Sequence, residues 1–356
     1  MPQSTALTQP SHINHDSFLT NPNRPNHSKS LQHVRFIDLF AGIGGFHQAL
    51  SRFGARCVFA SEWDKHASQT YQDNYGIAPF GDITQINEAD IPAHDILCAG
   101  FPCQAFSISG KQKGFDDTRG TLFFDIARIT RQHRPKILLL ENVKNLLRHD
   151  KGNTLTTIVS TLQDLGYVVH FSLLNASDFG LPQNRERVYF VAIRQDLPHT
   201  EFVFPCLSGQ TVCLNDVLQD NPDAKVIERD DIDVYKQYEP EQDSTGSYIL
   251  PNRPVQIGIV NKGGQGERIY HPLGHAITLS AHGGGVGAKT GLYKIGETIR
   301  KLSPRECARL QGFPDTFKIT ASPAQAYKQF GNSVAVSVLV AIIKAMIEQD
   351  IFDFQE

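Results

Sequence analysis

Short apolar runs alternate with glycine turns and helical patterns over the first two thirds of the chain, and this alternation limits the folds that the sequence can adopt. The first unit, "VRFIDLFAGIGGFHQALSRFG", opens with an apolar run from Val34 to Phe40 and continues into glycines. Apolar residues at helical spacing follow and end at Gly54. A strand that leads through a glycine turn into an amphipathic helix is the building unit of open parallel sheets.

The same unit recurs along the chain. We expect further strands within 55–64, 94–101, 135–143, 167–176 and 185–194, and helices that reach about Asn74 or span 120–133 and 153–166. This alternation predicts an α/β fold: a Rossmann-like, mostly parallel sheet with helices on both faces. We place this catalytic and cofactor-binding domain at 33–200.

The alternation is lost after Leu197. Prolines, an acidic stretch, "ERDDIDVY", and a glycine-rich stretch, "NKGGQGERIYHPLGHAITLSAHGGGVGAKTG", predict a small second domain of loops and short strands at 201–300. In "LSPRECARLQGFP" we expect a helix with Ser303 as its N-cap and Pro304 at its first position. "GNSVAVSVLVAIIKAMIEQDIF" predicts a long apolar helix, so 301–356 should return and pack on the first domain.

Composition places few limits on function. Hydrophobic residues make up 40% and charged residues 20% of the 356 residues, as in globular proteins. The net charge of -3 does not indicate a nucleic-acid-binding protein, although a basic cleft can exist within a neutral total. The six cysteines form no CxxC pair, which favours free thiols in a reducing cytoplasm over disulfides or a metal site.

The N-terminal segment differs from the rest in composition. Residues 1–32 are rich in Asn, Pro, Ser, His and Gln and show no periodicity, which predicts a disordered arm. The segment lacks the charged and apolar regions of an export signal. We also find no apolar run that approaches the length needed to span a bilayer, so no membrane association is expected.

The glycine turn "DLFAGIGG" (38–45) lies where ligands of open parallel sheets bind, at the carboxyl end of a strand. Its spacing is not GxGxxG, and an ordinary tight turn is the alternative interpretation. Glu62, after the second strand, is placed to accept hydrogen bonds from a ribose. Trp63 can stack on a purine or pack in the core, and Asp82 in "GDIT" can accept from an adenine amine. Together these features predict an adenosine-containing cofactor, and the lack of a P-loop argues against ATP hydrolysis.

Pro102 and Cys103 follow the strand at 94–101, at the same predicted edge of the sheet. An isolated cysteine is more often a packing residue, as we expect for Cys98 inside that strand. Cys103 differs because a polar segment with lysines, glycines and Arg119 follows it. Such a segment is suited to close over a phosphate backbone.

"LLLENV" places Glu141 at the end of the next strand. A carboxyl group that follows three leucines should be partly desolvated, so we expect a raised pKa and the ability to donate a proton to a ring nitrogen. A charge at a helix N-terminus is the alternative. Arg185 and Arg187 alternate on one face of a strand start, where they can grip phosphate or a base carbonyl, or form a surface salt-bridge ladder.

A thiolate, a proton-donating acid and an adenosine cofactor together suggest one reaction. Attack of the thiolate on C6 of cytosine, with protonation at N3, makes C5 nucleophilic enough to take an electrophilic methyl group. Because the target atom is buried in a duplex, the base must be flipped out.

The motifs "DLFAGIGG", "EWD", "GDIT", "GFPCQAFS", "ENV", "QNRER" and "QFGNSV" occur in this order. The chain, over about residues 33–350, resembles the bacterial DNA (cytosine-5)-methyltransferases of restriction–modification systems. The resemblance implies the S-adenosylmethionine-dependent methyltransferase fold, this cofactor without a metal, and double-stranded DNA as the substrate. It further implies a monomer in the bacterial cytoplasm, paired with a restriction endonuclease.

The resemblance also implies roles for individual residues. Cys103 matches the nucleophile, Glu141 the partner of N3, Arg187 the residue at the cytosine carbonyl, and Arg185 its support. The matching cofactor positions are Phe40, Gly42, Gly45, Glu62, Trp63, Asp82, Asn332 and Ser333. The DNA-binding positions are Ser107, Lys111, Arg119, Gln265 and Arg268.

"KGGQGERIY" and "AITLSAHGGGVGAKTG" resemble the target-recognition domain of one family member. By this resemblance Gln265 would enter the duplex where the cytosine leaves, and Arg268 would read guanine in the major groove. We therefore expect a short, GC-rich palindromic site, with GCGC as the first prediction.

Three other functions are open to such a sequence. A tRNA (cytosine-5) methyltransferase shares the "PCQ" and "ENV" patterns but lacks this glycine-rich recognition segment. A catalytically silent DNA-binding relative should have lost the cysteine or the glutamate, and both are present. A thiol-redox enzyme needs a resolving cysteine near Cys103, and the nearest, Cys98, is expected inside a strand.

Overall fold

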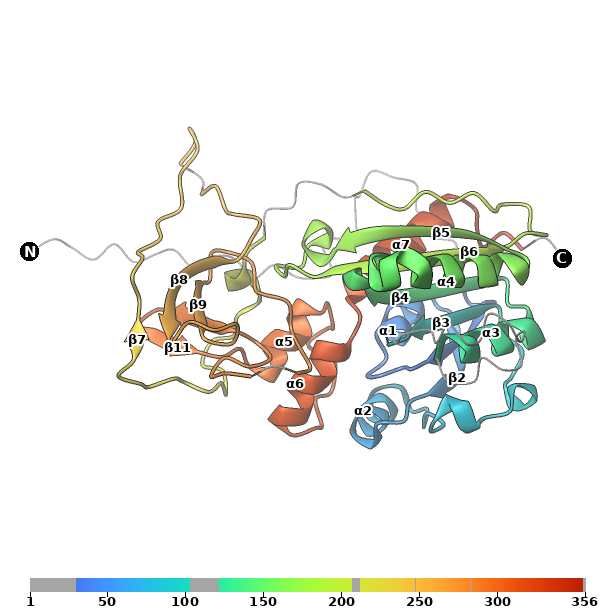
Figure 1. The fold of residues 1–356 in the computed structure, drawn as a ribbon, viewed down its shortest axis with the longest axis horizontal. Coiled ribbons are helices and arrows are strands. Elements are labelled where there is room, and N and C mark those ends of the chain that lie inside the picture. The colour runs from blue at the N-terminus through green and yellow to red at the C-terminus, as the bar shows by residue number, and fades with distance from the viewer. Residues whose placement is uncertain (1–29, 103–121, 207–211, 247, 283, 355–356) are drawn as a thin grey trace, which may run out of the picture.

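The structure, a computed structural model, describes residues 30–102, 122–206, 212–246, 248–282 and 284–354. Two β-sheets lie side by side, with two helices between them (Figure 1). The predictions for Cys103, Ser107, Lys111 and Arg119, and for the arm up to residue 29, lie outside the described residues.

The larger sheet has six strands in the order β2-β1-β3-β4-β6-β5. These are β1 Arg35–Leu39, β2 Arg56–Ser61, β3 Ile96–Gly100, β4 Ile137–Val143, β5 Tyr167–Asn175 and β6 Glu186–Arg194. The strands β1 to β4 pair in parallel, whereas β6 runs antiparallel to both β4 and β5. The predicted mostly parallel sheet is therefore confirmed, and its one reversed strand brings the start of β6 to the carboxyl edge of β4.

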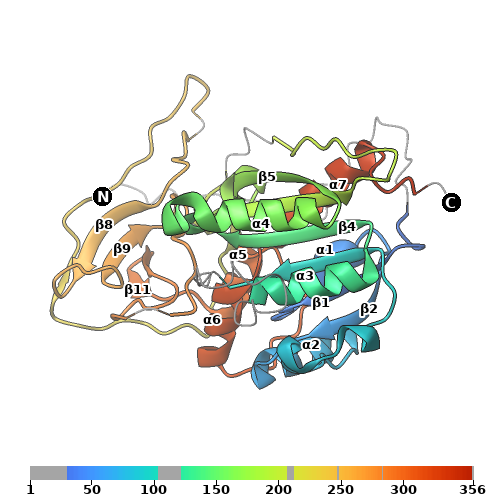
Figure 2. The ribbon, with the colours of Figure 1, turned by 45° about the vertical axis from the view of Figure 1, so that its right-hand side comes forward.

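Helices cover both faces of this sheet (Figure 2). The helices α1 Gly45–Ser51, α2 Lys65–Tyr75 and α7 Val336–Glu348 contribute to the core on one face. The helices α3 Leu122–His133 and α4 Asn153–Asp164 cover the other. Strand residues alternate between the two cores, as Leu138 and Leu139 do, so a side chain's position along its strand decides which layer it faces.

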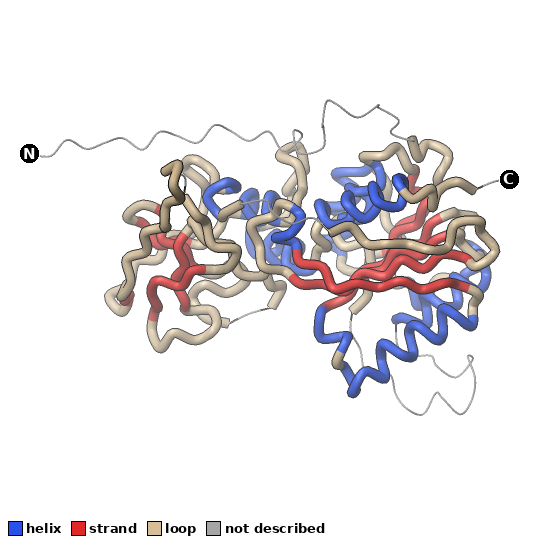
Figure 3. The backbone as a smooth tube through the Cα atoms, turned by 90° about the horizontal axis from the view of Figure 1, so that it is seen from above, coloured by secondary structure: helices blue, strands red, loops and turns tan. Residues whose placement is uncertain are grey.

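The smaller sheet has five strands in the order β11-β10-β9-β8-β7 and lies beside the first (Figure 3). They are β7 Ile232–Asp233, β8 Val255–Val260, β9 Arg268–His271, β10 Leu292–Ile295 and β11 Thr298–Arg300. A separate small core packs against them, with Ile257, Val260 and Leu292 at its centre. The predicted loop- and strand-rich second part is thus present.

Two short helices connect the sheets. The helix α5 Pro304–Leu310 begins as predicted, because the Ser303 hydroxyl accepts from the Glu306 backbone nitrogen and the Glu306 carboxylate accepts in return from Ser303. The helix α6 Pro323–Asn332 was not predicted. Its sequence carries the same signal, because Ser322 and Pro323 repeat the serine–proline start of α5. Shorter 3-10 turns lie at Ile83–Gln85, Glu88–Asp90, Lys144–Leu147, His149–Gly152, Ala176–Phe179 and Leu214–Val217.

The predicted long C-terminal helix is shorter than expected. The helix α7 starts only at Val336, because Ser333 and Ala335 have extended backbones that separate it from α6. As predicted, α7 packs on the first sheet, with Val338, Leu339 and Ile342 buried in the α1 side of the core.

One described segment passes a length-and-composition test for a membrane-spanning helix, although the sequence suggested none. Pro323–Glu348 is long and apolar enough by length and composition alone. The most apolar stretch of this segment is 72% buried within the protein. Its apolar side chains are accounted for by the packing of α7 on the first sheet.

Leu31, which we assigned to the predicted disordered arm at 1–32, is part of the folded protein. Leu31 is 1% exposed and packs in the α1 side of the core. Its backbone nitrogen also donates to the Phe53 carbonyl, 2.8 Å away. Because Leu31 is a single apolar residue between polar neighbours, the local sequence pattern does not indicate a buried helix or strand there.

The segment between α6 and α7 lies where the two sheets meet. A β-carbon at Gly331 would overlap the backbone of Ser280 and Ala281, and one at Gly45 would overlap the side chain of Val334. Only glycine lets these backbones come so close. The segment 331–334 is therefore wedged between the glycine turn after β1 and the strand-rich part of the chain.

We predict that Gly331→Ala lowers the free energy of unfolding by about 1–3 kcal/mol, because its methyl group would push two backbone segments apart. Gly284→Ala is the matched control, since nothing lies within 4 Å of its β-carbon position and its φ is not positive. Urea denaturation of the two variants measures the difference. Equal urea midpoints for the two variants would show that the close approach at Gly331 does not affect stability.

Candidate active site

The glycine turn after β1 combines backbone strain with open space. Phe40 has a φ of 54°, a conformation that costs a bulky residue energy. Gly42 has a φ of 55°, and no atom lies within 4 Å of the position where its β-carbon would be. The turn therefore presents bare backbone at the carboxyl edge of the sheet.

Glu62, just after β2, is fastened to this turn. One carboxylate oxygen accepts from the Gly42 backbone nitrogen at 2.8 Å, and the other accepts from the Asp64 nitrogen at 2.7 Å. Burial raises the pKa of Glu62, and the two backbone donors oppose this effect. The carboxylate is thus held in one orientation beside the open backbone of Gly42.

The aromatic residue next to Glu62 is not a core residue. Trp63 is 80% exposed, which excludes the packing interpretation left open by the sequence. Phe80 is also exposed, and its ring stacks on Phe59 with centroids 4.8 Å apart. Asp82 lies at the surface, where its carboxylate accepts from the backbone nitrogen of Thr84 at 3.0 Å. The edge at β2 thus presents an aromatic ring and carboxylates together.

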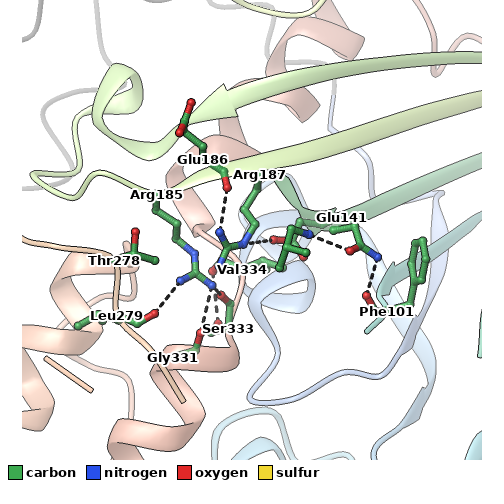
Figure 4. Close-up of polar contacts among 12 residues, drawn as sticks. Phe101, Glu141, Arg185, Glu186, Arg187, Thr278, Leu279, Gly331, Ser333 and Val334 are labelled. Carbon is green, nitrogen blue, oxygen red and sulfur yellow. Dashed lines mark hydrogen bonds and ion pairs between the residues drawn. The ribbon is translucent and has the colours of Figure 1, made fainter. Parts of the chain in front are cut away.

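Glu141 lies in β4, paired in register with Gly100 of β3 on one side and Tyr189 of β6 on the other. Its carboxylate forms an ion pair with Arg187, whose Nε lies 3.1 Å from Oε1 (Figure 4). Burial raises the pKa of Glu141, while Arg187 and Arg185 lower it in part. The raised pKa that the sequence predicted is confirmed. The position within a strand removes the helix-terminus alternative.

Arg185 was grouped with the catalytic residues, yet its guanidinium points into the protein. It is 2% exposed and donates to the carbonyls of Leu279 at 3.2 Å, Gly331 at 3.2 Å and Ser333 at 2.6 Å (Figure 4). These contacts satisfy backbone groups from two distant segments. Arg185 therefore holds backbone segments in place. Arg187 instead forms an ion pair with the carboxylate of Glu141.

The backbone that leads to Cys103 is anchored by Asn142. Its side-chain nitrogen donates to the Phe101 carbonyl at 2.8 Å, two residues before the cysteine, and its oxygen accepts from the Val143 nitrogen. Cys98 is fully buried in β3 and burial raises the pKa of its thiol, which confirms its interpretation as a packing residue.

The motif "QFGNSV" contacts both the glycine turn after β1 and the end of β3. Asn332 is exposed, whereas Ser333 is buried and its hydroxyl donates to the Val334 carbonyl at 3.3 Å. A β-carbon at Gly100 would lie 3.4 Å from Val334 and 3.7 Å from Glu141 Oε2. Sequence reasoning missed Val334 as the contact between the glycine turn and the end of β3. The glycines opposite it were the available signal.

Gln265 and Arg268 lie apart from this edge, on the second sheet. Gln265 is exposed in the turn between β8 and β9, and Arg268 is exposed at the first position of β9. Glu267 braces the turn by accepting from the Gly264 nitrogen at 2.9 Å and from Asn261 at 2.8 Å. The turn and the start of β9 therefore expose two polar side chains, of which Arg268 also hydrogen-bonds Tyr270.

The edge of the first sheet can thus hold a polar ligand at the glycine turn and present a buried acid at the end of β4. A carboxyl group with a raised pKa, beside an arginine, can donate a proton to a ring nitrogen and take it back. The structure thus places an open ligand-binding turn and a buried acid at the same edge of one sheet.

Comparison with known proteins identifies the class. The family model of C-5 cytosine-specific DNA methylases matches residues 34–348, so the chain belongs to this family. It is a cytosine-5 DNA methyltransferase of the restriction–modification type.

Particular relatives are similar over most of their length. The Type II methyltransferase M.HhaI of Haemophilus parahaemolyticus is 54% identical over 313 residues, which cover 87% of this chain and 93% of that protein. The Type II methyltransferase M.HpaII of Haemophilus parainfluenzae is 46% identical over 324 residues, or 88% and 89% of the two chains.

Among solved structures, the S. pombe Dnmt2 methyltransferase superposes with a TM-score of 0.63 at 21% identity, covering 88% of this chain and 98% of that one. This likeness supports the methyltransferase fold that the sequence predicted.

Protonation of Glu141 should change stability in a definite direction. Because burial raises its pKa above the ordinary 4.5, protonation stabilises the folded state fully below pH 4.5, and this stabilisation is lost as the pH rises through the raised pKa. We predict that Glu141→Gln, which carries no charge, increases the urea midpoint at neutral pH. The increase should shrink as the pH falls towards 4.5.

Arg187→Met is the opposing variant. It leaves the buried carboxylate without its cation and should cost about 3–5 kcal/mol at neutral pH, with recovery in acid. A difference between Glu141→Gln and the unmodified protein that does not vary with pH would contradict this account of Glu141.

Proposed function

We propose that this enzyme transfers a methyl group from S-adenosylmethionine to C5 of a flipped-out cytosine in double-stranded DNA, through a covalent adduct between Cys103 and C6. The observation that carries the proposal is the buried carboxyl group of Glu141, held by Arg187 and paired in register with Gly100. Cys103 follows Gly100 by three residues.

The residues at the glycine turn fit the cofactor. The open space at Gly42 lets a ligand approach the backbone, and the oriented carboxylate of Glu62 suits the two hydroxyls of a ribose. The exposed ring of Trp63 can stack on adenine. We assign Phe40, Gly45, Asp82, Asn332 and Ser333 to the same cofactor site. S-adenosylmethionine bound there would supply an electrophilic methyl group.

The protein's own groups activate the cytosine. The thiolate of Cys103 attacks C6, which moves electron density towards N3 and C5. Glu141 supplies the proton that N3 takes up, because its carboxyl group holds a proton at a higher pH than an ordinary glutamate. Arg187 lies beside Glu141, where it can donate to the O2 carbonyl of the same ring.

Release of the product reverses the addition. C5 takes the methyl group with loss of S-adenosylhomocysteine, a base removes the C5 proton and passes it to solvent, and the bond between C6 and the sulfur breaks. Glu141 then recovers its proton from N3, and Cys103 leaves as a thiolate. The enzyme is thereby returned to its starting protonation state.

Sequence recognition is assigned to the second sheet. We propose that Gln265 enters the duplex in place of the cytosine and that Arg268 donates to O6 and N7 of guanine. Ser107, Lys111 and Arg119 would contact the DNA near the target base. The similarity to M.HhaI in "KGGQGERIY" supports GCGC as the recognition site.

The biological setting follows from the family. We propose that the enzyme acts as a monomer in the bacterial cytoplasm and protects DNA from a cognate restriction endonuclease. The domains are proposed as 33–200 for catalysis, 201–300 for target recognition and 301–356 for the returning helices. The family match supports DNA over RNA as the substrate.

Covalent trapping tests the proposed adduct. On a GCGC duplex in which 5-fluorocytosine replaces cytosine, we predict a stable protein–DNA complex that requires S-adenosylmethionine, because the fluorine cannot be eliminated as a proton can. Denaturing electrophoresis detects the complex. Cys103→Ser should give no complex and no methyl transfer while it still binds the duplex.

Cys98→Ser is the matched control and should trap normally, because that thiol is buried in β3. Glu141→Gln should slow methyl transfer by about 10²–10⁴-fold. Trapping by the Cys103→Ser variant would exclude Cys103 as the nucleophile.

The recognition assignment makes a separate prediction. Arg268→Ala should weaken binding to GCGC by about 1–3 kcal/mol and reduce discrimination against a changed guanine. Gln265→Gly should weaken the specific complex and leave cofactor affinity unchanged. Fluorescence anisotropy with matched and mismatched duplexes measures both effects, and a loss of cofactor affinity in either variant would place these residues in the wrong site.

A further inference from the structure

The carboxylate of Glu62 is oriented through a neighbour that another part of the chain controls. Its two oxygens accept from Gly42 and Asp64 backbone nitrogens, at 2.8 and 2.7 Å. The first bond ties it to the glycine turn, and the second ties it to the start of α2. A shift of Asp64 would therefore turn the Glu62 carboxylate away from the ligand position.

Asp64 is held from two sides. Its Oδ1 caps α2 by accepting from the backbone nitrogens of His66 at 2.9 Å and Ala67 at 3.1 Å. Its Oδ2 lies 2.6 Å from Nζ of Lys328, which belongs to α6. Burial alone would raise the pKa of Asp64, but the bond from Lys328 and the backbone donors lower it. The carboxylate is thus charged at neutral pH.

The helices α2 and α6 lie side by side (Figures 1 and 2) and are joined at further points. The Thr70 hydroxyl donates to the Gln329 side chain at 3.3 Å. The Asn74 side chain bonds to the backbone of Lys318 in both directions, at 2.7 and 2.9 Å. The Thr70 contact joins α2 to α6, and the Asn74 contact joins the end of α2 to the segment before α6.

The far end of α6 reaches the other half of the site. The carbonyls of Gly331 and Ser333 accept from Arg185, two residues before the arginine that pairs with Glu141. One short helix therefore contacts the cofactor edge through Lys328 and the catalytic edge through Arg185.

We propose that Lys328 is a positioning residue for the cofactor: its ion pair with Asp64 fixes the start of α2, and Asp64 in turn fixes Glu62. The proposal rests on the proposed role of Glu62 at the ribose. Lys328 itself touches neither cofactor nor DNA in this account, so its removal should change cofactor affinity and leave the chemical step intact.

Tryptophan fluorescence gives a direct readout, because Trp63 is the only tryptophan and is exposed beside Glu62. We expect Lys328→Gln to raise the Kd for S-adenosylhomocysteine by about two- to fivefold, the range for a partly exposed ion pair. The KM for S-adenosylmethionine should rise likewise, with kcat unchanged. The effect should fade at high salt.

A second variant separates the ion pair from the helix cap. Asp64→Asn keeps the oxygen that caps α2 but loses the charge, so it should weaken cofactor binding as much as Lys328→Gln does. The double variant should be no weaker than either single one, because both remove the same interaction. Lys344→Gln, on the exposed side of α7, is the matched control and should bind the cofactor normally.

Glu62→Gln distinguishes failure of this proposal from failure of the proposed function. If Glu62→Gln weakens cofactor binding and Lys328→Gln does not, the positioning role of Lys328 is wrong. If Glu62→Gln itself binds the cofactor normally, the proposed role of Glu62 at the ribose is wrong. Additive losses in the double variant would also overturn the proposal, since they would mean that Asp64 and Lys328 act separately.

Discussion

The buried guanidinium of Arg185 is the contact on which the arrangement of the whole site depends. It donates to carbonyls of Leu279, Gly331 and Ser333, and so joins β6 to the second-sheet region and to the end of α6. A charged group that is 2% exposed is stable only with such partners. Because Arg185 directly precedes β6 and Arg187 is the second residue of that strand, the contact that joins the two sheets also helps to place the partner of Glu141.

The rest of the site follows from where strands end. Parallel strands β1 to β4 bring the glycine turn, Glu62, the approach to Cys103 and Glu141 to one edge. The reversed strand β6 adds Arg187 there, because its first residues lie opposite the last residues of β4. The segment 331–334 then fills the space between them, with Val334 against Gly45 and Gly100. The cofactor side and the cytosine side are thus in contact through a few tightly packed residues.

Local patterns predicted much of this arrangement. The strand–turn–helix units, the cap at Ser303 and the raised pKa of Glu141 all depend on residues near each other in the sequence, and each is confirmed. Contacts across the fold were harder to predict. The inward direction of Arg185, the ion pair between Asp64 and Lys328, and the position of Val334 depend on how separate elements pack. The helix α6 was overlooked because the strongly apolar segment after it dominated the pattern.

The most direct test of the account is a map of 5-methylcytosine in plasmid DNA from cells that express this chain and lack other cytosine methyltransferases. We predict methylation of one cytosine in every GCGC site, on both strands, and none in cells that express Cys103→Ser. Methylation at a different sequence would contradict the recognition assignment. Methylation that persists with Cys103→Ser would contradict the covalent mechanism on which the rest of the account depends.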